Sequence, residues 1–314
     1  MRTIANTDLT VFPLCLGSNI FGWTADVRES FAVLDAYAAA GGNFIDTADS
    51  YSAWVDGNTG GEAETIIGRW MSSRGKRDAM VVATKVGKTP GLEGLAPATI
   101  RRAAEDSLKR LETDRIDLYY AHMDDEDTPI EDSLATFGEL IAEGKVRHIA
   151  ASNYTAPRLA AALELARAGE LPAYVAVQPA YNLLDRDEFE GPLQDLCERE
   201  GVDCIPYYGL AKGFLTGKYR PDGPDVSSQR AGSARAYLDD RGIATLTALD
   251  EVAAAHGATV AAVALAWLAA QPTVVAPIAS ARTPEQLAEL VGVAEVDLND
   301  AELSRLSAVA APVR

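Results

Sequence analysis

The chain has 314 residues, of which 48% are hydrophobic and 24% are charged, and its formal net charge is -18 at pH 7. These proportions are those of an ordinary globular protein and exclude a disordered or fibrous chain. The negative charge argues against nucleic acids and anionic membrane surfaces as partners, because binding to them requires a basic face. Any phosphorylated ligand would therefore need a local cluster of lysine and arginine residues.

The sequence carries no sign of export or membrane insertion. Its first residues include Arg2 and Asp8 and form no continuous apolar core, so they do not predict a signal peptide. The longest apolar run, Ala258–Ala270, is too short to span a membrane. No C-x-x-C pair occurs among the three cysteines, Cys15, Cys197 and Cys204. We therefore expect a soluble protein in the reducing cytoplasm.

Short apolar runs alternate with longer amphipathic segments along the chain. The runs predict eight strands: Leu14–Gly17, Asn43–Asp46, Met80–Lys85, Ile116–His122, Val146–Ser152, Tyr174–Gln178, Val202–Tyr207 and Val274–Ile278. Each is almost entirely apolar, as expected of a strand that is buried on both faces. Helical periodicity links them, for example at Ile100, Ala104, Leu108 and Leu111. Eight strand–helix units predict an α/β protein, a (β/α)8 TIM barrel formed by residues 1–314 as one domain.

Three segments lie outside this repeat. Thr3–Phe12 predicts a β-hairpin that plugs the bottom of the barrel. Asn299 and Glu302 predict a capping box at the start of an extra C-terminal helix. The stretch Tyr208–Gly242 is rich in Gly, Pro and Ser, and a loop of this length in a compact domain is either a functional lid or disordered. We favour a lid.

Polar residues follow the apolar runs at positions that should converge. In TIM barrels the active-site residues lie at the carboxyl ends of the strands. In this chain those ends carry Asp46, Lys85, His122, Ser152, Asn153 and Gln178. We therefore expect their side chains to meet at one mouth of the barrel.

The residue types around three of these strand ends suit acid catalysis on a carbonyl compound. Tyrosine is a weak acid, but a nearby ammonium stabilises the phenolate and so lowers the pKa of the phenol. Lys85 can supply this charge to Tyr51, and Asp46 can hold the ammonium in place. A neutral His122 can orient the substrate oxygen. We therefore predict that Tyr51 is the proton donor.

These residues, in this order, resemble the aldo-keto reductase family over nearly the whole chain. The resemblance rests on Gly41–Ala48 followed by Tyr51, Ala83–Lys85, Ser152–Asn153, Gln178 with Tyr181–Asn182, and Tyr207 with Leu215–Tyr219. It implies a TIM barrel that binds extended NADP(H) and passes hydride to a carbonyl carbon. It also implies that Asp46, Tyr51, Lys85 and His122 form the catalytic tetrad.

The resemblance further implies a set of cofactor contacts. Ser152, Asn153 and Gln178 would hold the carboxamide, and Tyr207 would stack on the nicotinamide ring. The pyrophosphate and adenosine would lie against Leu210, Lys212, Gly213, Lys218, Ser280, Arg282, Gln286 and Glu289. Lys212, Lys218 and Arg282 then supply the required basic cluster. Arg282 favours NADPH over the alternative, NADH, because arginine can bind a ribose phosphate through two hydrogen bonds.

The chain departs from the common family pattern at the cofactor end. Tyr208-Gly209 replaces Ser-Pro, and Ala279-Ser280 replaces Pro-Gly. Leu290 stands where an asparagine often contacts adenine. These changes bear on cofactor affinity and selectivity and leave the tetrad intact.

Three aromatic residues on the first loops are predicted to form an apolar substrate pocket: Phe21, Trp23 and Trp54. Ordinary packing on the barrel rim is the alternative for the two tryptophans. Sugars, small aldehydes and steroid-like ketones all fit this prediction, and the working direction can be reduction or alcohol oxidation. We expect a monomer or a weak homo-oligomer.

Two other functions stay open at this point. A protein of this fold can serve as a redox-sensing subunit that holds cofactor and turns over slowly. A metal-dependent isomerase or hydrolase would take its ligands from His122 and the acidic run Met123–Asp127. We expect no metal, because adjacent carboxylates on a flexible run rarely converge on one ion.

Overall fold

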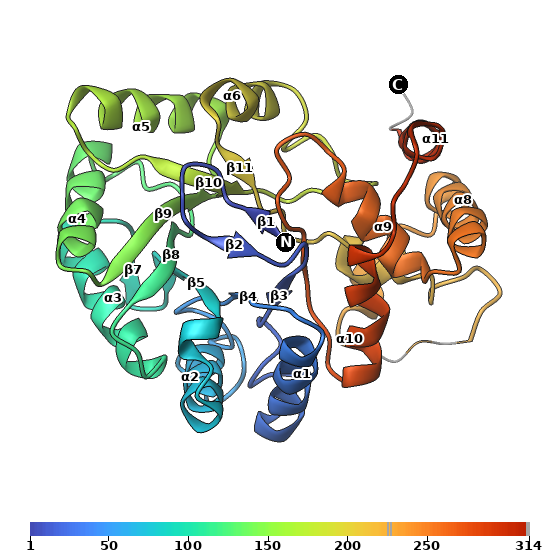
Figure 1. Cartoon of the computed structure of the whole chain (residues 1–314), viewed down its shortest axis with the longest axis horizontal. Helices are drawn as coiled ribbons and strands as arrows, with labels where there is room; N and C mark the ends of the chain where they lie inside the picture. The colour runs from blue at the N-terminus through green and yellow to red at the C-terminus, as the bar shows by residue number, and fades with distance from the viewer. Residues whose placement is uncertain (225, 227, 312–314) are drawn as a thin grey trace.

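The computed structural model describes residues 1–224, 226 and 228–311. Eight parallel strands form one sheet in the order β11-β10-β9-β8-β5-β4-β3-β12, and helices surround it (Figure 1). These strands are β3 (Cys15–Gly17), β4 (Phe44–Asp46), β5 (Val81–Val86), β8 (Ile116–Ala121), β9 (Val146–Ser152), β10 (Tyr174–Gln178), β11 (Asp203–Cys204) and β12 (Ile278–Ala279). Two-stranded pairs are formed by β1 (Arg2–Thr3) with β2 (Thr10–Val11) and by β6 (Lys88–Thr89) with β7 (Leu92–Glu93).

Helices alternate with the strands of the eight-stranded sheet from β3 to β11, as the sequence predicts. They are α1 (Val27–Ala39), α2 (Glu62–Arg74), α3 (Pro97–Arg110), α4 (Ile130–Ala142), α5 (Ala156–Ala168), α6 (Pro192–Glu200), α7 (Ala231–Arg235), α8 (Asp240–His256), α9 (Val260–Ala269), α10 (Pro284–Val291) and α11 (Asp300–Val309). Short 3-10 helices are η1 (Arg77–Ala79), η2 (Ala211–Thr216) and η3 (Gly292–Ala294). The predicted apolar face of α3 is buried at Ile100, Ala104 and Leu108.

The two end strands of the sheet are joined through one short segment. Cys204 of β11 forms a bridge with Val274, and its N–H donates to the carbonyl oxygen of Thr273 at 2.8 Å. The N–H of Val275 donates in turn to the carbonyl oxygen of Cys204 at 3.0 Å. This segment leads into β12, which pairs with β3 on the other side. The predicted α/β TIM-barrel fold is therefore confirmed.

Two predicted strands have the wrong bounds. Val202–Tyr207 forms only the two-residue β11, and Val274–Ile278 pairs regularly only from Ile278, where β12 begins. Pro206 and Pro277 lie within these segments, and a proline nitrogen cannot donate to a neighbouring strand. The other six strands agree with their predicted bounds to within one residue at each end.

The N-terminal hairpin lies across the centre of the ring in Figure 1. Its apolar residues Ile4, Leu9 and Val11 are buried in one cluster with inward residues of the barrel strands. The N–H of Ala5 donates to the carboxylate of Asp203 at 2.6 Å, at the start of β11. The hairpin therefore closes the amino-terminal end of the barrel, as the sequence predicts.

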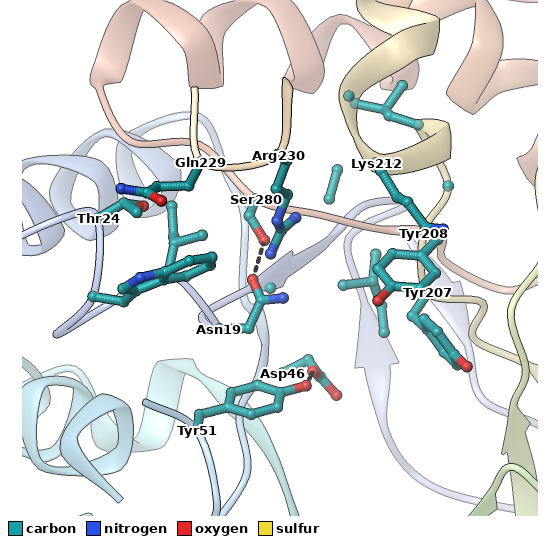
Figure 2. Close-up of a pocket in the computed structure, with 18 of the residues that line it drawn as sticks. Asn19, Thr24, Asp46, Tyr51, Tyr207, Tyr208, Lys212, Gln229, Arg230 and Ser280 are labelled. Carbon is teal, nitrogen blue, oxygen red and sulfur yellow. Dashed lines mark hydrogen bonds between the residues drawn. The ribbon is translucent and has the colours of Figure 1, made fainter. Parts of the chain in front are cut away.

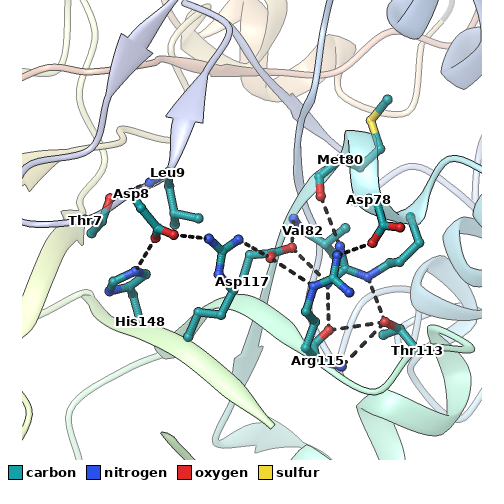
Figure 3. Close-up of polar contacts among 12 residues, drawn as sticks. Thr7, Asp8, Leu9, Asp78, Met80, Val82, Thr113, Arg115, Asp117 and His148 are labelled. Carbon is teal, nitrogen blue, oxygen red and sulfur yellow. Dashed lines mark hydrogen bonds and ion pairs between the residues drawn. The ribbon is translucent and has the colours of Figure 1, made fainter. Parts of the chain in front are cut away.

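An ion-pair network at the same end joins the hairpin to the strands (Figure 3). Asp8 of the hairpin accepts a hydrogen bond from Arg147 at 2.6 Å and lies 3.0 Å from Nε2 of His148. These contacts with His148 and Arg147 lower the pKa of Asp8 to about 2. Arg147 also donates to the buried Asp117 at 2.8 Å, and Arg77 approaches that carboxylate at 2.9 Å. Asp117 thus has the counter-charges that a buried carboxylate needs.

The C-terminal helix lies where the sequence predicts it. Asn299 and Glu302 form the predicted capping box, each side chain accepting from the other residue's N–H at 3.0 Å. Tyr208–Gly242 contains η2 and α7, while Asp225 and Ser227 within it lie outside the described residues.

The cysteines Cys15, Cys197 and Cys204 are free and buried. In the described ranges no single helix is long and apolar enough to cross a membrane, and the pair α8 and α9 meets that test jointly but is bent by 96°.

Because the hairpin closes the barrel, removal of one of its buried side chains should lower the stability of the protein. Leu9→Ala should lower the free energy of unfolding by about 2–5 kcal/mol, because it leaves a cavity in the barrel interior. Ile243→Ala, at a half-exposed position on α8, serves as the control and should change it by less than about 0.5 kcal/mol. Urea unfolding measures both variants, and equal midpoints for Leu9→Ala and wild type would contradict the closure.

Candidate active site

The four tetrad residues predicted from the sequence meet at the carboxyl end of the barrel. Asp46 is the last residue of β4, Lys85 lies near the end of β5, and His122 directly follows β8. Tyr51 lies on the loop between β4 and α2. Because β4, β5 and β8 are neighbours in a parallel sheet, their ends bring these side chains together.

The ammonium of Lys85 lies within hydrogen-bonding distance of four oxygen atoms. Nζ is 2.7 Å from each carboxylate oxygen of Asp46, 2.7 Å from the carbonyl oxygen of Thr47 and 3.0 Å from Oη of Tyr51. The lysine is fully buried. Burial lowers the pKa of Lys85, and the charge of Asp46 opposes this shift. The buried ammonium therefore depends on Asp46 to keep its proton.

The phenol of Tyr51 is hydrogen-bonded to both members of this ion pair. It donates to Oδ2 of Asp46 at 3.2 Å and accepts from Lys85, and Figure 2 shows Tyr51 beside Asp46. Burial, followed by the charge of Asp46, raises the pKa of Tyr51 well above its ordinary value. The prediction that Lys85 lowers this pKa is therefore wrong, because burial and the carboxylate outweigh the ammonium. Tyr51 keeps its proton at neutral pH.

His122 lies beside Tyr51, with 6.1 Å between the two ring centroids. Burial, followed by the charges of Lys85 and Lys88, lowers the pKa of His122 well below its ordinary value. Its Nδ1 is buried and forms no hydrogen bond with any described residue. A neutral imidazole in this place can donate one N–H to a substrate oxygen.

A cavity of about 1000 Å³ opens above the tetrad. Asp46, Tyr51 and His122 line it, and Lys85 lies beneath them. The cavity is also lined by every residue that the sequence assigns to the cofactor: Ser152, Asn153, Gln178, Tyr207, Leu210, Lys212, Gly213, Lys218, Ser280, Arg282, Gln286 and Glu289.

The residues predicted to hold the carboxamide are already joined by hydrogen bonds. Tyr207 donates to Oδ1 of Asn153 at 2.9 Å, and Nδ2 of Asn153 donates to Oγ of Ser152 at 3.0 Å. Ser152 donates to the carbonyl oxygen of Gln178 at 2.9 Å. Nε2 of Gln178 donates to Asp46 at 2.9 Å, so this polar chain ends on the tetrad.

The basic residues predicted for the phosphates lie at the other end of the cavity. Burial, followed by the charge of Arg282, lowers the pKa of Lys218, and Glu289 opposes the shift. Nζ of Lys212 lies 5.5 Å from the ring centroid of Tyr208. Among residues whose placement is described, none of Lys212, Lys218 and Arg282 forms an ion pair with a carboxylate.

The structure brings Trp23 and Trp54 to the cavity and leaves Phe21 out of it. The two indole rings lie edge to face with centroids 5.7 Å apart, and Trp54 is 6.2 Å from the ring of Tyr51. Phe21 is fully buried in the core and does not line the cavity. An apolar residue at the start of a loop can pack inward or outward, and the sequence does not distinguish the two.

The polar residues that line the cavity and escaped the sequence analysis include Asn19, Lys88 and Arg230. Asn19 accepts a hydrogen bond from Ser280 at 3.1 Å, in the centre of Figure 2. The guanidinium of Arg230 lies 5.8 Å from the ring centroid of Trp23 and is above Asn19 in that view. The sequence could have indicated Arg230, because it is a basic residue within the predicted lid. An acidic chain needs such cations near a phosphorylated ligand.

Two carboxylates of the acidic run after His122 accept hydrogen bonds from other parts of the chain. Asp124 binds Arg158 at 2.6 Å, and Asp125 accepts from the N–H of Leu95 at 2.7 Å. Over the described ranges, no three His, Cys, Asp or Glu side chains are grouped so that they could hold a metal ion.

Comparison with known proteins places this site in a family. The sequence model of the Aldo/keto reductase family matches residues 13–311. Protein tas of Escherichia coli (strain K12) is 31% identical, over 98% of this chain and 96% of that protein. The chain belongs to the aldo-keto reductase family. Norsolorinic acid reductase stcV of Emericella nidulans is 34% identical, over 94% of this aldo-keto reductase and 77% of its relative.

A third relative of this aldo-keto reductase is named as a channel subunit and not as a reductase. The probable voltage-gated potassium channel subunit beta of Oryza sativa subsp. japonica is 31% identical, over 92% of this chain and 89% of that protein. Family membership and the named reductases identify the chain as an oxidoreductase of a family that generally uses NAD(P)H.

Because Lys85 and Asp46 form a buried ion pair, removal of the negative charge of Asp46 should strongly lower the stability of the protein. Asp46→Asn should lower the free energy of unfolding by about 3–5 kcal/mol, because it leaves the ammonium of Lys85 buried without a counter-charge. Asp56→Asn, the same change at an exposed position of the next loop, is the matched control. Guanidinium unfolding at neutral pH gives both values, and a loss no larger than that of the control would argue against the pairing.

Proposed function

We propose that this aldo-keto reductase reduces an aldehyde or ketone to the alcohol with NADPH, and that Tyr51 is the general acid. The observation that carries the proposal is the position of the Tyr51 hydroxyl. It lies at the floor of the cavity, protonated, 3.0 Å from the ammonium of Lys85. A phenol held in this way can protonate a carbonyl oxygen that lies above it.

The charges around the cavity fit a polyanionic cofactor. Its basic lining consists of Lys88, Lys212, Lys218, Arg230 and Arg282. Its acidic lining consists of Asp46, which is paired with Lys85, and Glu289. A cavity with excess positive charge, in a chain whose formal net charge is -18, supports binding of a dinucleotide with an additional phosphate. Arg282 would hold that phosphate, and Lys218 would lie against the same end.

Apart from hydride supply, each step of the proposed reaction is assigned to residues of this chain. The nicotinamide cofactor supplies the hydride when bound. His122 donates a hydrogen bond that orients the carbonyl oxygen, and Tyr51 transfers its proton to that oxygen as negative charge develops there. Lys85 stabilises the phenolate that results, and Asp46 keeps Lys85 charged. Trp23 and Trp54 exclude water from one side of the substrate.

The redox-sensing subunit stays the second candidate because one relative is named as a channel subunit. Binding of cofactor would be seen in either case, whereas fast turnover would be seen only if the chain is an enzyme. Steady-state rates on a panel of carbonyls and alcohols, with NADPH and NADH, therefore separate the two functions. Rates above about 1 s⁻¹ on a good substrate favour the enzyme.

The substitution Tyr51→Phe tests whether Tyr51 is the general acid. The variant should lose about 10²–10⁴-fold in kcat, because it has no proton to transfer, and should bind NADPH with an almost unchanged Kd. Nicotinamide absorbance follows turnover, and quenching of tryptophan fluorescence follows binding. Wild-type turnover in Tyr51→Phe would rule out the assignment.

Arg282→Ala tests the cofactor preference. The KM for NADPH should rise by about 10- to 100-fold, since a charge-assisted pair with the ribose phosphate is lost, while the KM for NADH should change little. Arg102→Ala, on the exposed face of α3, is the control. If both KM values rose equally, Arg282 would contribute general attraction and no selectivity.

A further inference from the structure

The cavity contains a cation to which the proposed cofactor contacts give no role. Arg230 directly precedes α7, and its half-buried side chain lines the cavity. Within the described ranges its guanidinium forms no ion pair with a carboxylate and donates no hydrogen bond; only its backbone N–H does, to Ser228 at 3.1 Å. Burial lowers the pKa of Arg230, but an arginine keeps its proton at neutral pH. A partly buried charge of this kind is stabilised when a ligand brings an anion to it.

A series of ring contacts connects Arg230 to the proposed proton donor. The guanidinium carbon lies 5.8 Å from the ring centroid of Trp23, on the loop after β3. The indole of Trp23 lies edge to face with that of Trp54, with centroids 5.7 Å apart. Trp54 is in turn 6.2 Å from the ring centroid of Tyr51, on the same β4–α2 loop. Arg230 therefore lies at the far end of an aromatic wall that begins at Tyr51.

The cations assigned to the cofactor lie on other elements than this wall. Lys212 belongs to η2, Lys218 follows that helix, and Arg282 lies between β12 and α10. In Figure 2 Arg230 enters the cavity apart from Lys212 and lies above Asn19. The phosphates of the cofactor therefore have basic partners without Arg230.

The chemistry of Arg230 and its surroundings indicates which anion fits. A guanidinium that lies against an aromatic ring keeps its N–H groups available for hydrogen bonds. These groups match a planar carboxylate, which can accept two parallel hydrogen bonds. The indole rings beside it suit an apolar body. Since the formal net charge of the chain is -18, an anionic substrate would be repelled unless the cavity held a cation for it.

We propose that Arg230 is a specificity-determining residue that binds a carboxylate of the carbonyl substrate. The inference rests on the proposed function, because it names the substrate class of the same site. The substrate is then an aldehyde or ketone with an aromatic or other apolar body, which packs against Trp23 and Trp54, and with a carboxylate remote from the reacting carbon. The carboxylate itself is unchanged, because hydride and proton add only to the carbonyl group.

Two probe aldehydes that differ only in charge test this specificity. 4-Carboxybenzaldehyde carries the carboxylate, and its methyl ester carries the same reacting group without it. At saturating NADPH, wild type should have the higher kcat/KM for the acid. Arg230→Gln should lower the acid-to-ester ratio of kcat/KM by about 10- to 100-fold, as expected for loss of a charge-assisted pair. The ester is the internal control, because general damage to the site would lower both values.

Arg282→Ala provides the matched control among the cations of the cavity. At saturating NADPH it should keep the acid-to-ester ratio of wild type, because Arg282 is assigned to the cofactor. In Arg230→Gln the Kd for NADPH, measured by quenching of tryptophan fluorescence, should change much less than the ratio does. The two variants would thereby separate a substrate contact from a cofactor contact.

A binding measurement gives a readout that needs no turnover. The product alcohol, 4-(hydroxymethyl)benzoate, cannot react in the presence of NADPH, because no group is available to accept its hydride. Calorimetric titration into the protein saturated with NADPH gives its Kd. This Kd should rise by about 10- to 100-fold in Arg230→Gln, while that of the methyl ester of the alcohol should change little.

The outcomes separate failure of this inference from failure of the proposed function. An acid-to-ester ratio in Arg230→Gln equal to that of wild type, or a preference of wild type for the ester, would overturn the inference. A weaker Kd for NADPH with an unchanged ratio would also overturn it and would assign Arg230 to the pyrophosphate of the cofactor. Absence of turnover on both aldehydes, with the difference in Kd for the alcohol intact, would instead remove the proposed reduction and leave the carboxylate site.

Discussion

The ammonium of Lys85 has been removed from water at the end of a buried strand, and the arrangement of the site follows from the need to keep it charged. Transfer of an ion of this kind to the protein interior costs several kcal/mol, which close counter-charges and hydrogen bonds must offset. Asp46 supplies the charge, and the carbonyl oxygen of Thr47 and the phenol of Tyr51 supply further contacts. The proposed proton donor is thus held in place by the same group that would later stabilise its anion.

The two ends of the barrel differ in whether their charged side chains form ion pairs. At the hairpin end, Asp117 is bound by Arg77 and Arg147, and Asp8 adds a carboxylate that binds Arg147, so charges there are paired. At the mouth, Lys218 and Arg282 both line the cavity, and neither forms an ion pair with a carboxylate in the described chain. Pairing stabilises the closed end, whereas uncompensated cations leave the open end ready for an anion. This difference makes a strongly acidic chain compatible with a phosphorylated cofactor.

The sequence predicted the fold and most of the cavity because buried parallel strands leave a clear pattern. Most of the apolar runs end in a polar residue, so the sequence alone places Asp46, Lys85 and His122 at one mouth of the barrel. Pro206 and Pro277 shortened two strands, and a run of apolar residues does not show by itself where pairing stops. Periodicity predicts elements and faces, and it is least informative where proline interrupts the ladder.

The residues that the sequence analysis misplaced or did not name lie on irregular loops. Phe21 turned inward and Arg230 turned toward the cavity, and no repeat along the chain distinguishes these orientations. The direction of the Tyr51 pKa was missed for a related reason. Residue types indicated an ammonium near a phenol, but the net shift depends on burial and on the distances to both charges, which only the folded arrangement determines.

The raised pKa of Tyr51 changes the role that Lys85 has in the proposed proton donation. Before reaction, the phenol keeps its proton, because burial and the charge of Asp46 outweigh the ammonium. A developing alkoxide is a stronger base than phenolate, so it can take the proton even from a phenol of raised pKa. The ammonium, 3.0 Å from the oxygen, then interacts with a full negative charge instead of a neutral hydroxyl. In the proposed mechanism, Lys85 therefore lowers the energy of the transition state more than that of the resting site, which is what catalysis requires.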